Sequence, residues 1–395
     1  MSLDAFRQEV SSWLTEHCPE SARGAGEPIT IGSKRPMKNP ELLEWRLKLG
    51  EKGWTVPTWP KEYGGGGLSA EENQILQDEL AAIKARTPLG GMGVSMIGPT
   101  LLEYGTEEQK LRHIPKIASG EVAWCQGYSE PGAGSDLASL QTKMVDKGDF
   151  YEINGQKIWT SGANFADWIF TLVRTDPDAA KHDGISFILI DMDQSGITTK
   201  PIRLISGTSP FCETFFDDAT ARKDDLVGQL NRGWTVGKRL LQHERSGQGG
   251  LRPGARRTAP PRNILAETAK KYVGVDSTGR INDTAVRDRV IQFAMDQKSL
   301  QTTQKRAREE NTSGQTPGDA TSIFKYYGGT LQRDSANFRC DLMGTQGYGW
   351  DEAGFSDQEL EATRAFLHSR AITIYGGTNE VQLNIISKRV LGLPD

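Results

Sequence analysis

Residues 374–382 read Ile-Tyr-Gly-Gly-Thr-Asn-Glu-Val-Gln, a double glycine followed by a hydroxyl and a run with helical periodicity. A turn of this kind leaves free N–H groups at the start of the helix, and these groups suit an anion. Gly376 and Gly377 have no side chain, so neither can act as an acid or a base. The turn is therefore suited to cradle a ligand, and any proton transfer must come from another segment.

A second stretch with chemically active groups is Leu-Leu-Gln-His-Glu-Arg-Ser-Gly at 240–247, where an imidazole, a carboxylate and a guanidinium are adjacent. On the residues alone, Glu244 and Arg245 are typical of a charge pair on a helix surface. The alternative is that Glu244 is a carboxylate base, and His243 is a further candidate for that role. Both interpretations stay open at this point.

Metal chemistry is not indicated by the sequence. The four cysteines lie far apart, and no two of the five histidines have the spacing of metal ligands on a helix. Free thiols of this kind are typical of a reducing compartment. We therefore predict no metal site and no disulfide.

The bulk composition sets the class of protein. A chain of 395 residues suits two or three modules around a large core. Hydrophobic residues make up 36% and charged residues 25%, which is typical of a globular protein. The formal net charge of −4 argues against a nucleic-acid-binding protein. Without an N-terminal apolar region or an apolar run of membrane-spanning length, we expect a cytoplasmic protein with no membrane span.

The elements that must position these groups fall into three zones. Residues 1–124 have helical periodicity, and Ser69 with Glu72 predicts a capping box at one helix start. Residues 125–230 contain short β-type runs, and Asn154-Gly155 predicts a hairpin turn between two of them. Residues 231–395 are helical again. We therefore predict an N-terminal helical domain, a middle antiparallel barrel or sandwich, and a C-terminal helical domain.

One segment interrupts the third zone. Residues 246–263 are rich in glycine, proline and arginine, and prolines do not fit a helix interior. The segment is either a solvated basic loop or the rim of a site for a phosphorylated ligand.

Three stretches resemble the acyl-CoA dehydrogenase family in order and separation: WCQGYSEPGAGSDLASLQT at 124–142, INGQKIWTSGANFADWIF at 153–170, and SRAITIYGGTNEVQLNIISKRVLGLP at 369–394. The resemblance implies an N-terminal all-α domain, a β-barrel-like middle domain and a C-terminal four-helix bundle. It also implies an FAD enzyme that oxidises acyl-CoA thioesters to trans-2-enoyl-CoA and passes the electrons to an electron-transferring flavoprotein.

In the first stretch, the resemblance assigns Gln126, Tyr128 and Ser129 to the pyrimidine edge of the flavin. Ser135 matches a position near the pantetheine and phosphates of the CoA substrate. A short hydroxyl flanked by glycine lets backbone N–H groups approach an anionic oxygen closely.

In the second stretch, Trp159 matches the aromatic residue that packs beside the flavin. Ser161 matches the hydroxyl donor to flavin N5, where many relatives carry threonine. In the third stretch, Thr378 and Glu380 match contacts to the adenosine pyrophosphate of FAD. Relatives often have glutamine at position 380, so we expect the Glu380 carboxylate to contact a ribose hydroxyl or backbone rather than the pyrophosphate.

Two further segments match weaker cofactor positions. DLMGTQGYG at 341–349 resembles the segment that contacts the FAD of a partner subunit, with Gly344 and Gly347 at matching positions. Arg287 is a candidate for an FAD-binding position on the preceding helix.

The resemblance also bears on the missing base. Many relatives carry a catalytic glutamate at the position of Gly376. Isovaleryl-CoA and long-chain members carry it instead on the first helix of the C-terminal domain, directly before an arginine, which Glu244 and Arg245 match. Glu244 is thus the predicted base, with Arg245 orienting the carboxylate or contacting substrate. The backbone N–H of Gly376 is the predicted donor to the thioester oxygen.

Glycine at 376 also removes a side chain from beside the substrate α-carbon. We therefore expect a branched or bulky acyl group, in fatty acid β-oxidation or steroid side-chain catabolism. The resemblance implies a homotetramer or homodimer, with a heterotetramer as the alternative. A flavin monooxygenase or oxidase on the same fold and a subunit of a heteromeric acyl-CoA dehydrogenase remain alternative functions.

Overall fold

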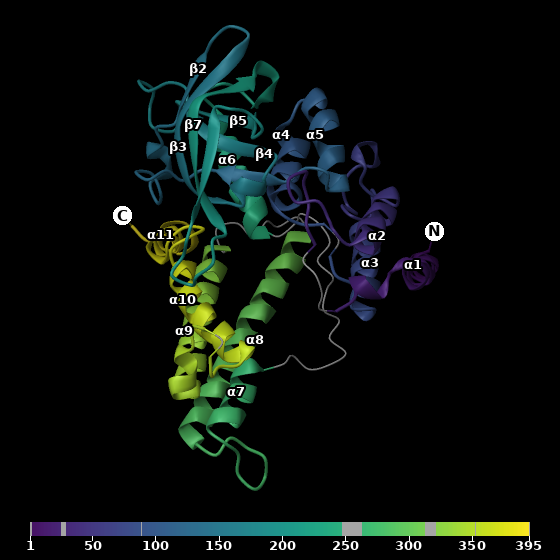
Figure 1. Ribbon diagram of the computed structural model, residues 1–395, viewed down its shortest axis with the longest axis vertical. Coiled ribbons are helices and arrows are strands. Elements are labelled where there is room, and N and C mark those ends of the chain that lie inside the picture. The colour runs from purple at the N-terminus through teal and green to yellow at the C-terminus, as the bar shows by residue number, and fades with distance from the viewer. Residues whose placement is uncertain are drawn as a thin grey trace. The chain divides into compact units, whose positions relative to one another are not determined.

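The computed structural model describes residues 2–24, 29–87, 89–246, 263–312, 321–351 and 353–394, and the side chains of 244–246 and 308–312 are outside the described set. The chain forms two compact units (Figure 1). The first unit comprises Met1–Ile202 and Ser209–Thr258, and the second comprises Arg203–Thr208 and Ala259–Asp395. The domain boundaries at 124 and 230 stay a prediction.

Helices α1 to α6 belong to the first unit. Their bounds are α1 Leu3–His17, α2 Pro40–Glu51, α3 Ala70–Ala82, α4 Gly98–Tyr104, α5 Glu107–Ser119 and α6 Gly233–Ser246. The predicted capping box is confirmed, because Ser69 and Glu72 each accept a hydrogen bond from the other's backbone N–H. Helix α1 buries Phe6, Val10 and Leu14, which lie on one face at helical spacing.

The middle of the chain forms an eight-stranded mixed sheet. Its strands are β1 Trp124–Gly127, β2 Lys143–Asp146, β3 Phe150–Ser161, β4 Trp168–Arg174, β5 Ile185–Asp191, β6 Ile197–Ile202, β7 Phe211–Arg222 and β8 Leu226–Val227. The order is β6-β7-β3-β2-β4-β5-β8, and β1 pairs with β4 in parallel. Alternate residues of β4 and β5 enter two separate cores, and Val236 and Leu240 of α6 join one of these cores. Helix α6 therefore packs directly on the sheet (Figure 1).

The predicted hairpin turn at Asn154-Gly155 is wrong. Strand β3 continues through these residues, and its register with β7 shifts between Ile153 and Gly155. A Cβ at Gly155 would lie 2.7 Å from the Cα of Thr142, so only glycine fits this approach. The Asn154 side chain and Asp218 exchange two hydrogen bonds across the strands. Asp217 and Asp218 of β7 lie opposite Asn154 alone, so the β-bulge is in β7 and the Asn154-Gly155 pair is the regular strand that faces it.

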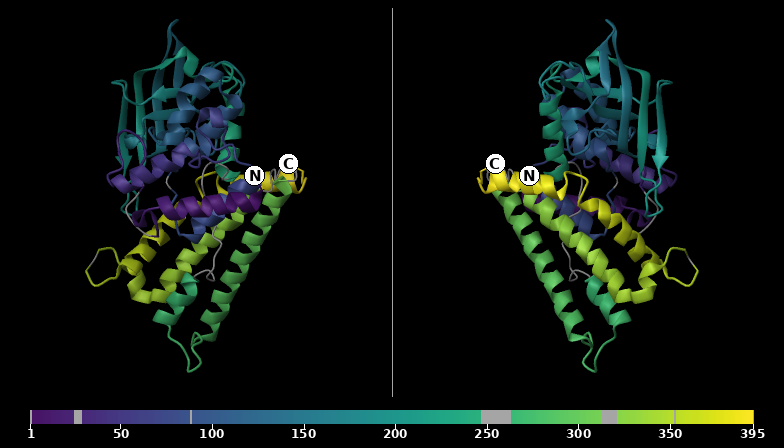
Figure 2. Two further views of the ribbon diagram at one scale, coloured as in Figure 1. Left: turned by 90° about the vertical axis from the view of Figure 1, so that its right-hand side faces the viewer. Right: turned by 90° about the vertical axis from the view of Figure 1, so that its left-hand side faces the viewer.

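The second unit is a helical bundle. Its helices are α7 Ile264–Tyr272, α8 Thr284–Thr312, α9 Thr321–Met343, α10 Asp357–Ile372 and α11 Asn379–Ile385. Helix α9 packs against each of the other four, and Figure 2 shows α8 and α9 running alongside each other. Leu265, Val290 and Phe338 form part of its apolar core. The predicted order of helical, β and helical zones is confirmed.

Candidate active site

The turn between α10 and α11 in the second unit has a left-handed backbone. Gly376 has a φ of +66° and Gly377 a φ of +88°. The Gln382 amide nitrogen donates to the Gly376 carbonyl at 3.2 Å, and a Cβ at Gly377 would lie 2.3 Å from the same nitrogen. Thr378 caps α11 by accepting from the Val381 N–H at 3.2 Å. Both glycines are therefore required by the conformation and packing of the turn.

Lys325 of α9 contacts this turn, and the sequence patterns did not predict that contact. Its ammonium donates to the Ile372 carbonyl at 2.5 Å and lies 5.5 Å from the centre of the Tyr375 ring. A Cβ at Gly376 would lie 3.3 Å from the Cε atom of Lys325. A cation is thus fixed beside Gly376, the position to which the resemblance assigns the glutamate base of many relatives.

In the first unit, the predicted ring contacts come together at the end of β1 and in β3. We call residues 126–129 and 158–161 the ring seat. The Ile158 N–H donates to the Ser129 carbonyl at 2.9 Å and joins its two segments. The Tyr128 hydroxyl donates to the Gly237 carbonyl of α6 at 3.4 Å. The seat is therefore built from β1, β3 and the packing of α6.

Trp159 has a backbone conformation that is rare for a bulky residue. Its φ is +61°, and the register of β3 with β7 shifts between Lys157 and Thr160. The indole stays 51% exposed and meets the Phe211 ring edge-on at 6.1 Å between centroids. Strain of this kind persists where the surrounding structure enforces it, and it concentrates at functional sites. Ser161 follows in β3, opposite Phe211 in the ladder.

Ser135 lies in an exposed loop of the first unit. The loop is closed by a reciprocal pair of backbone hydrogen bonds between Glu130 and Ala133, each 3.0 Å long. Next to Ser135, the Asp136 carboxylate pairs with the Lys181 ammonium at 2.5 Å, which lowers the pKa of Asp136. Ser135 is thus exposed, and the residue that follows it is paired with a lysine.

The predicted base lies on α6. The backbone of Glu244 and Arg245 is helical, but their side chains lie outside the described residues, as do 247–262 of the basic segment. His243 is buried, and its Nε2 lies 3.4 Å from the Glu103 carboxylate of α4. Burial and the nearby Arg239 lower the pKa of His243. His243 therefore contributes to the contact between α4 and α6.

The remaining candidates lie in the second unit. Gly347 is structural: a Cβ there would lie 2.7 Å from the Cys340 carbonyl, and its own carbonyl accepts from the Thr363 hydroxyl at 2.9 Å. Gly344 has a φ of +57° and ends α9. Glu380 lies in the first turn of α11, one residue beyond its start.

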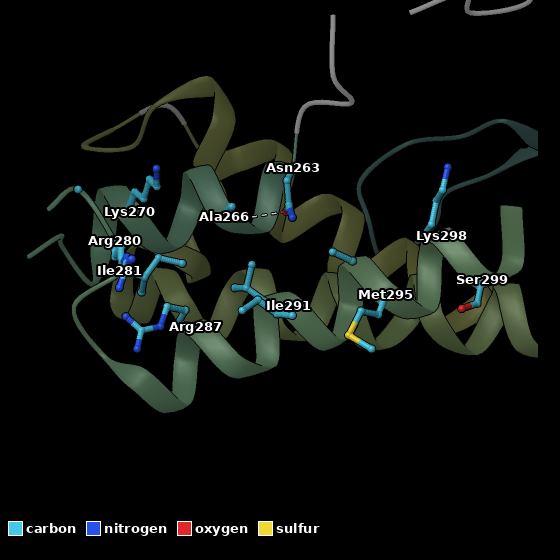
Figure 3. A pocket seen from close by; sticks show the side chains of 13 residues that line it. Asn263, Ala266, Lys270, Arg280, Ile281, Arg287, Ile291, Met295, Lys298 and Ser299 are labelled. Carbon is cyan, nitrogen blue, oxygen red and sulfur yellow. Dashed lines mark hydrogen bonds between the residues drawn. The ribbon is translucent and has the colours of Figure 1, made fainter. Parts of the chain in front are cut away.

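Arg287 lines a pocket of about 700 Å³ between α7 and α8. Figure 3 shows Lys270, Arg280 and Arg287 at one end of this pocket and Lys298 toward the other. The wall between them is apolar and includes Ile281, Val290, Ile291 and Met295. A pocket with cations around an apolar wall suits a ligand that has both an anionic and an apolar part.

All three zones of the chain match models of one family. The N-terminal, middle and C-terminal domains of acyl-CoA dehydrogenases match residues 2–121, 125–219 and 231–391. Acyl-CoA dehydrogenase IpdE1 of Mycobacterium tuberculosis is 35% identical over 399 residues, covering 99% of this chain and 98% of that relative. The chain belongs to the acyl-CoA dehydrogenase family.

Solved structures agree with this placement. The Tcur3481-Tcur3483 steroid ACAD is 30% identical with a TM-score of 0.74, over 99% of this chain and 97% of that one. The ChsE4-ChsE5 complex from Mycobacterium tuberculosis is 30% identical with a TM-score of 0.72, over 100% and 98%. The expected acyl-CoA dehydrogenase fold is therefore confirmed. As an acyl-CoA dehydrogenase, the chain is an FAD-dependent oxidoreductase.

The described residues of this acyl-CoA dehydrogenase fit that cofactor. The Gln126 side-chain nitrogen is buried without a hydrogen-bond partner among the described residues. A buried donor of this kind needs an acceptor, and a flavin ring supplies acceptors along its pyrimidine edge. The exposed Trp159 indole offers an apolar face beside it.

Among the described residues, no group of three or more histidine, cysteine, aspartate or glutamate side chains has metal-binding geometry. None of the described helices is long and apolar enough to cross a membrane.

Proposed function

We propose that this chain dehydrogenates an acyl-CoA thioester between Cα and Cβ, with Glu244 as the base that removes the α-proton. The observation that carries the proposal is the turn at 374–382, where Gly376 provides no carboxylate and Lys325 lies beside it. Helix α6 of the same chain presents the sequence Glu244-Arg245, and Arg245 orients the carboxylate or contacts the substrate. FAD, when bound, supplies the hydride acceptor.

The other residues hold and polarise the reactants. The Gly376 N–H donates to the thioester oxygen and stabilises the negative charge that develops as the α-proton leaves. Gln126, Tyr128, Ser129 and Ser161 contact the polar edges of the ring. Ser135 binds the CoA moiety, and its exposure supports a contact with the substrate.

The adenosine pyrophosphate is held by residues of the second unit. Thr378 and Glu380 contact it or its ribose from the start of α11. Gly344 and Gly347 contribute to the FAD of a partner subunit, and Arg287 contributes to FAD binding from the preceding helix. The cations around the Arg287 pocket support this assignment, because a pyrophosphate needs basic partners.

The acyl group is bulky or branched, as in a steroid side chain. A glycine at 376 supports this, since no side chain occupies the space beside the α-carbon. One of the similar solved structures is a steroid ACAD. The physiological electron acceptor is an electron-transferring flavoprotein.

The enzyme assembles as a dimer or tetramer, and a heteromeric assembly is the candidate that the comparisons favour. Two of the solved relatives pair differently named chains, Tcur3481 with Tcur3483 and ChsE4 with ChsE5. The second unit also exposes large apolar side chains on α8, such as Ile291 and Met295. Exposed apolar patches of this kind are typical of subunit interfaces.

Anaerobic flavin bleaching tests the proposal. The FAD-loaded protein is mixed with straight, branched, aromatic and steroid-side-chain CoA thioesters, and loss of the flavin absorption is followed. We expect fastest bleaching by a bulky or steroid-side-chain thioester. Absence of bleaching by every thioester would contradict the dehydrogenase, and fast oxygen consumption by the reduced protein would favour the oxidase.

A further inference from the structure

The ring seat is anchored by a buried charge that the proposed reaction does not use. Lys157 of β3 is fully buried. Its ammonium donates to the Glu130 carboxylate at 2.8 Å and to the Tyr128 carbonyl at 3.1 Å. Burial lowers the pKa of Lys157 to about 8, and Glu130 opposes that shift. Lysines are rarely buried unless they are paired, and Lys157 is buried together with its partner Glu130.

Glu130 joins this lysine to the loop that follows β1. Its carboxylate accepts from the N–H of Gln141 at 2.6 Å and from the N–H of Thr142 at 2.9 Å. Burial alone would raise the pKa of Glu130, but Lys157 and the hydrogen bonds to the carboxylate lower it. The pair therefore fastens both ends of the 130–142 loop to β3.

The anchored atoms lie next to the ring contacts. Lys157 holds the carbonyl of Tyr128, and the neighbouring Ile158 N–H holds the carbonyl of Ser129. The register of β3 shifts directly after Lys157, and Trp159 takes its left-handed conformation within that shift. The ion pair thus fixes the backbone directly before Trp159, the residue with the strained conformation.

Stability alone does not explain a buried pair of this kind. Taking two charges out of water costs several kcal/mol, and apolar residues of similar volume often serve a fold as well or better. Where such a pair is present, its best-attested role is to specify one arrangement among several. In this chain the arrangement in question is the bulge that presents Trp159.

We propose that the Lys157–Glu130 ion pair is a positioning element that holds Trp159 and the Tyr128–Ser129 carbonyls in register for the flavin ring. The identity of the ring rests on the proposed function. Neither residue touches the reacting atoms, so Lys157 and Glu130 act through the ring seat and are not themselves catalytic.

The test compares Lys157→Met, Glu130→Gln and the double variant with a matched control. The control is Asp225→Asn, because Asp225 is a buried acid of the same unit that pairs with Arg112 at 2.7 Å, with α5 rather than the ring seat as its partner. Three quantities are measured: the melting temperature of the apo-protein, the visible circular dichroism of bound FAD, and kcat and KM with the best thioester.

We expect Lys157→Met and Glu130→Gln to lower the melting temperature, to change the flavin circular dichroism and to reduce kcat about 10²-fold while KM is nearly unchanged, as for a misplacement of about 1 Å. Asp225→Asn lowers the melting temperature without the other two effects. In the double variant the melting temperature recovers, because no unpaired charge remains, but the altered dichroism and low kcat persist.

Two outcomes overturn this inference. One is a double variant that regains kcat and the wild-type dichroism together with its melting temperature. The other is a Lys157→Met protein that differs from wild type in melting temperature alone, as the control does. A wild-type protein that takes up no FAD would overturn the proposed function as well, so the two failures are distinguishable.

Discussion

The ring seat in the first unit and the turn at 374–382 in the second unit both contain left-handed backbone, but they reach it in opposite ways. Trp159 has a φ of +61° with the largest side chain of the genetic code, and Gly376 has a φ of +66° with none. The proposed function needs the indole at 159, where strand pairing and a buried ion pair hold the strained backbone. At 376 it needs only the backbone N–H, and glycine adopts the same region without strain. Substitution should therefore have different consequences in the two regions.

The largest expected effect tests whether α6 supplies the base and the turn at 374–382 supplies only the backbone donor. If Glu244 supplies the base that the turn lacks, Glu244→Gln should retain FAD and acyl-CoA binding and slow flavin reduction at least about 10³-fold. Anaerobic stopped-flow measurement of the flavin absorption gives this rate. The exposed Glu44→Gln on α2 is the control and should change nothing.

Moving the carboxylate to the turn sharpens the same comparison. In the double variant Glu244→Gln, Gly376→Glu, the new side chain must adopt a φ of +66° and its Cβ lies 3.3 Å from the Cε atom of Lys325. We expect an ion pair with that lysine to hold the carboxylate and the rate to stay low. Full recovery of the rate in the double variant would show that the turn tolerates a base, and full activity of Glu244→Gln alone would exclude Glu244.

The next effect separates strain from function at position 159. Trp159→Gly relieves about 1–2 kcal/mol of left-handed strain and adds about 0.5–1 kcal/mol of backbone entropy cost. We therefore expect the melting temperature of the apo-protein to stay close to wild type. Flavin reduction should nevertheless slow about 10²-fold, because the ring loses its neighbour and its position.

Trp159→Phe is the matched variant, since it keeps both the strain and an aromatic face. It should retain most of the rate. A Trp159→Gly protein that melts at a much lower temperature and reduces flavin normally would mean that the indole is a packing residue and not a ring contact.

The sequence predicts those features of the two regions that depend on contacts between residues close together in the chain. The helix starts at Ser69 and Thr378 depend on neighbours three residues away, so local patterns predict them. Lys325 contacts Ile372, next to the turn at 374–382, although the two residues are 47 positions apart in the sequence. No local pattern predicts such a contact. The place of Lys325 beside Gly376 was therefore missed.

The two errors in the β region have related causes. Asn154-Gly155 predicted a turn because this pair favours a hairpin, but it faces a bulge in β7, and its close contact with Thr142 is not local to the pair. Lys157 was overlooked because lysine in a strand is normally solvated. A usable signal existed, since Lys157 lies an even number of residues from the buried Tyr151 and Ile153 and so shares their face of the sheet.

A smaller effect is expected at the turn. Gly376→Ala adds the cost of left-handed backbone, about 1–2 kcal/mol, and its Cβ pushes against Lys325. Both effects should displace the N–H that we propose as donor to the thioester oxygen. We expect kcat to fall about tenfold, less than for the complete loss of an oxyanion donor. Steady-state kinetics measure this change.

Gly392→Ala is the control for the backbone cost alone. Gly392 has a φ of +64°, and a Cβ there would meet nothing within 4 Å. The two variants should lose similar stability, but only Gly376→Ala should lose kcat. Equal kinetics in both would remove Gly376 from the oxyanion site.

The smallest effect concerns how each unit holds a buried carboxylate. Glu130 in the first unit faces an ammonium, whereas Glu359 of α10 accepts from the Tyr272 hydroxyl at 2.5 Å and the Ser356 N–H at 2.7 Å. The Tyr272 hydroxyl, with the Ser356 contacts, lowers the pKa of Glu359 to about 2. A folded pKa below the ordinary value of 4.5 stabilises the protein above that value. This contribution is lost as the pH falls from about 4.5 to about 2.

Glu359→Gln should therefore weaken the fold slightly at neutral pH and flatten the loss of helical circular dichroism between pH 5 and pH 2. Glu361→Gln on the same helix is the control, because its side chain is largely exposed and its removal should leave the acid transition unchanged. An acid transition in Glu359→Gln as steep as in wild type would mean that carboxylates elsewhere, such as Glu130 next to the ring seat, govern unfolding in acid. The loss of stability in acid would then come from the Lys157–Glu130 ion pair of the first unit and not from the neutral donors to Glu359 in the second unit.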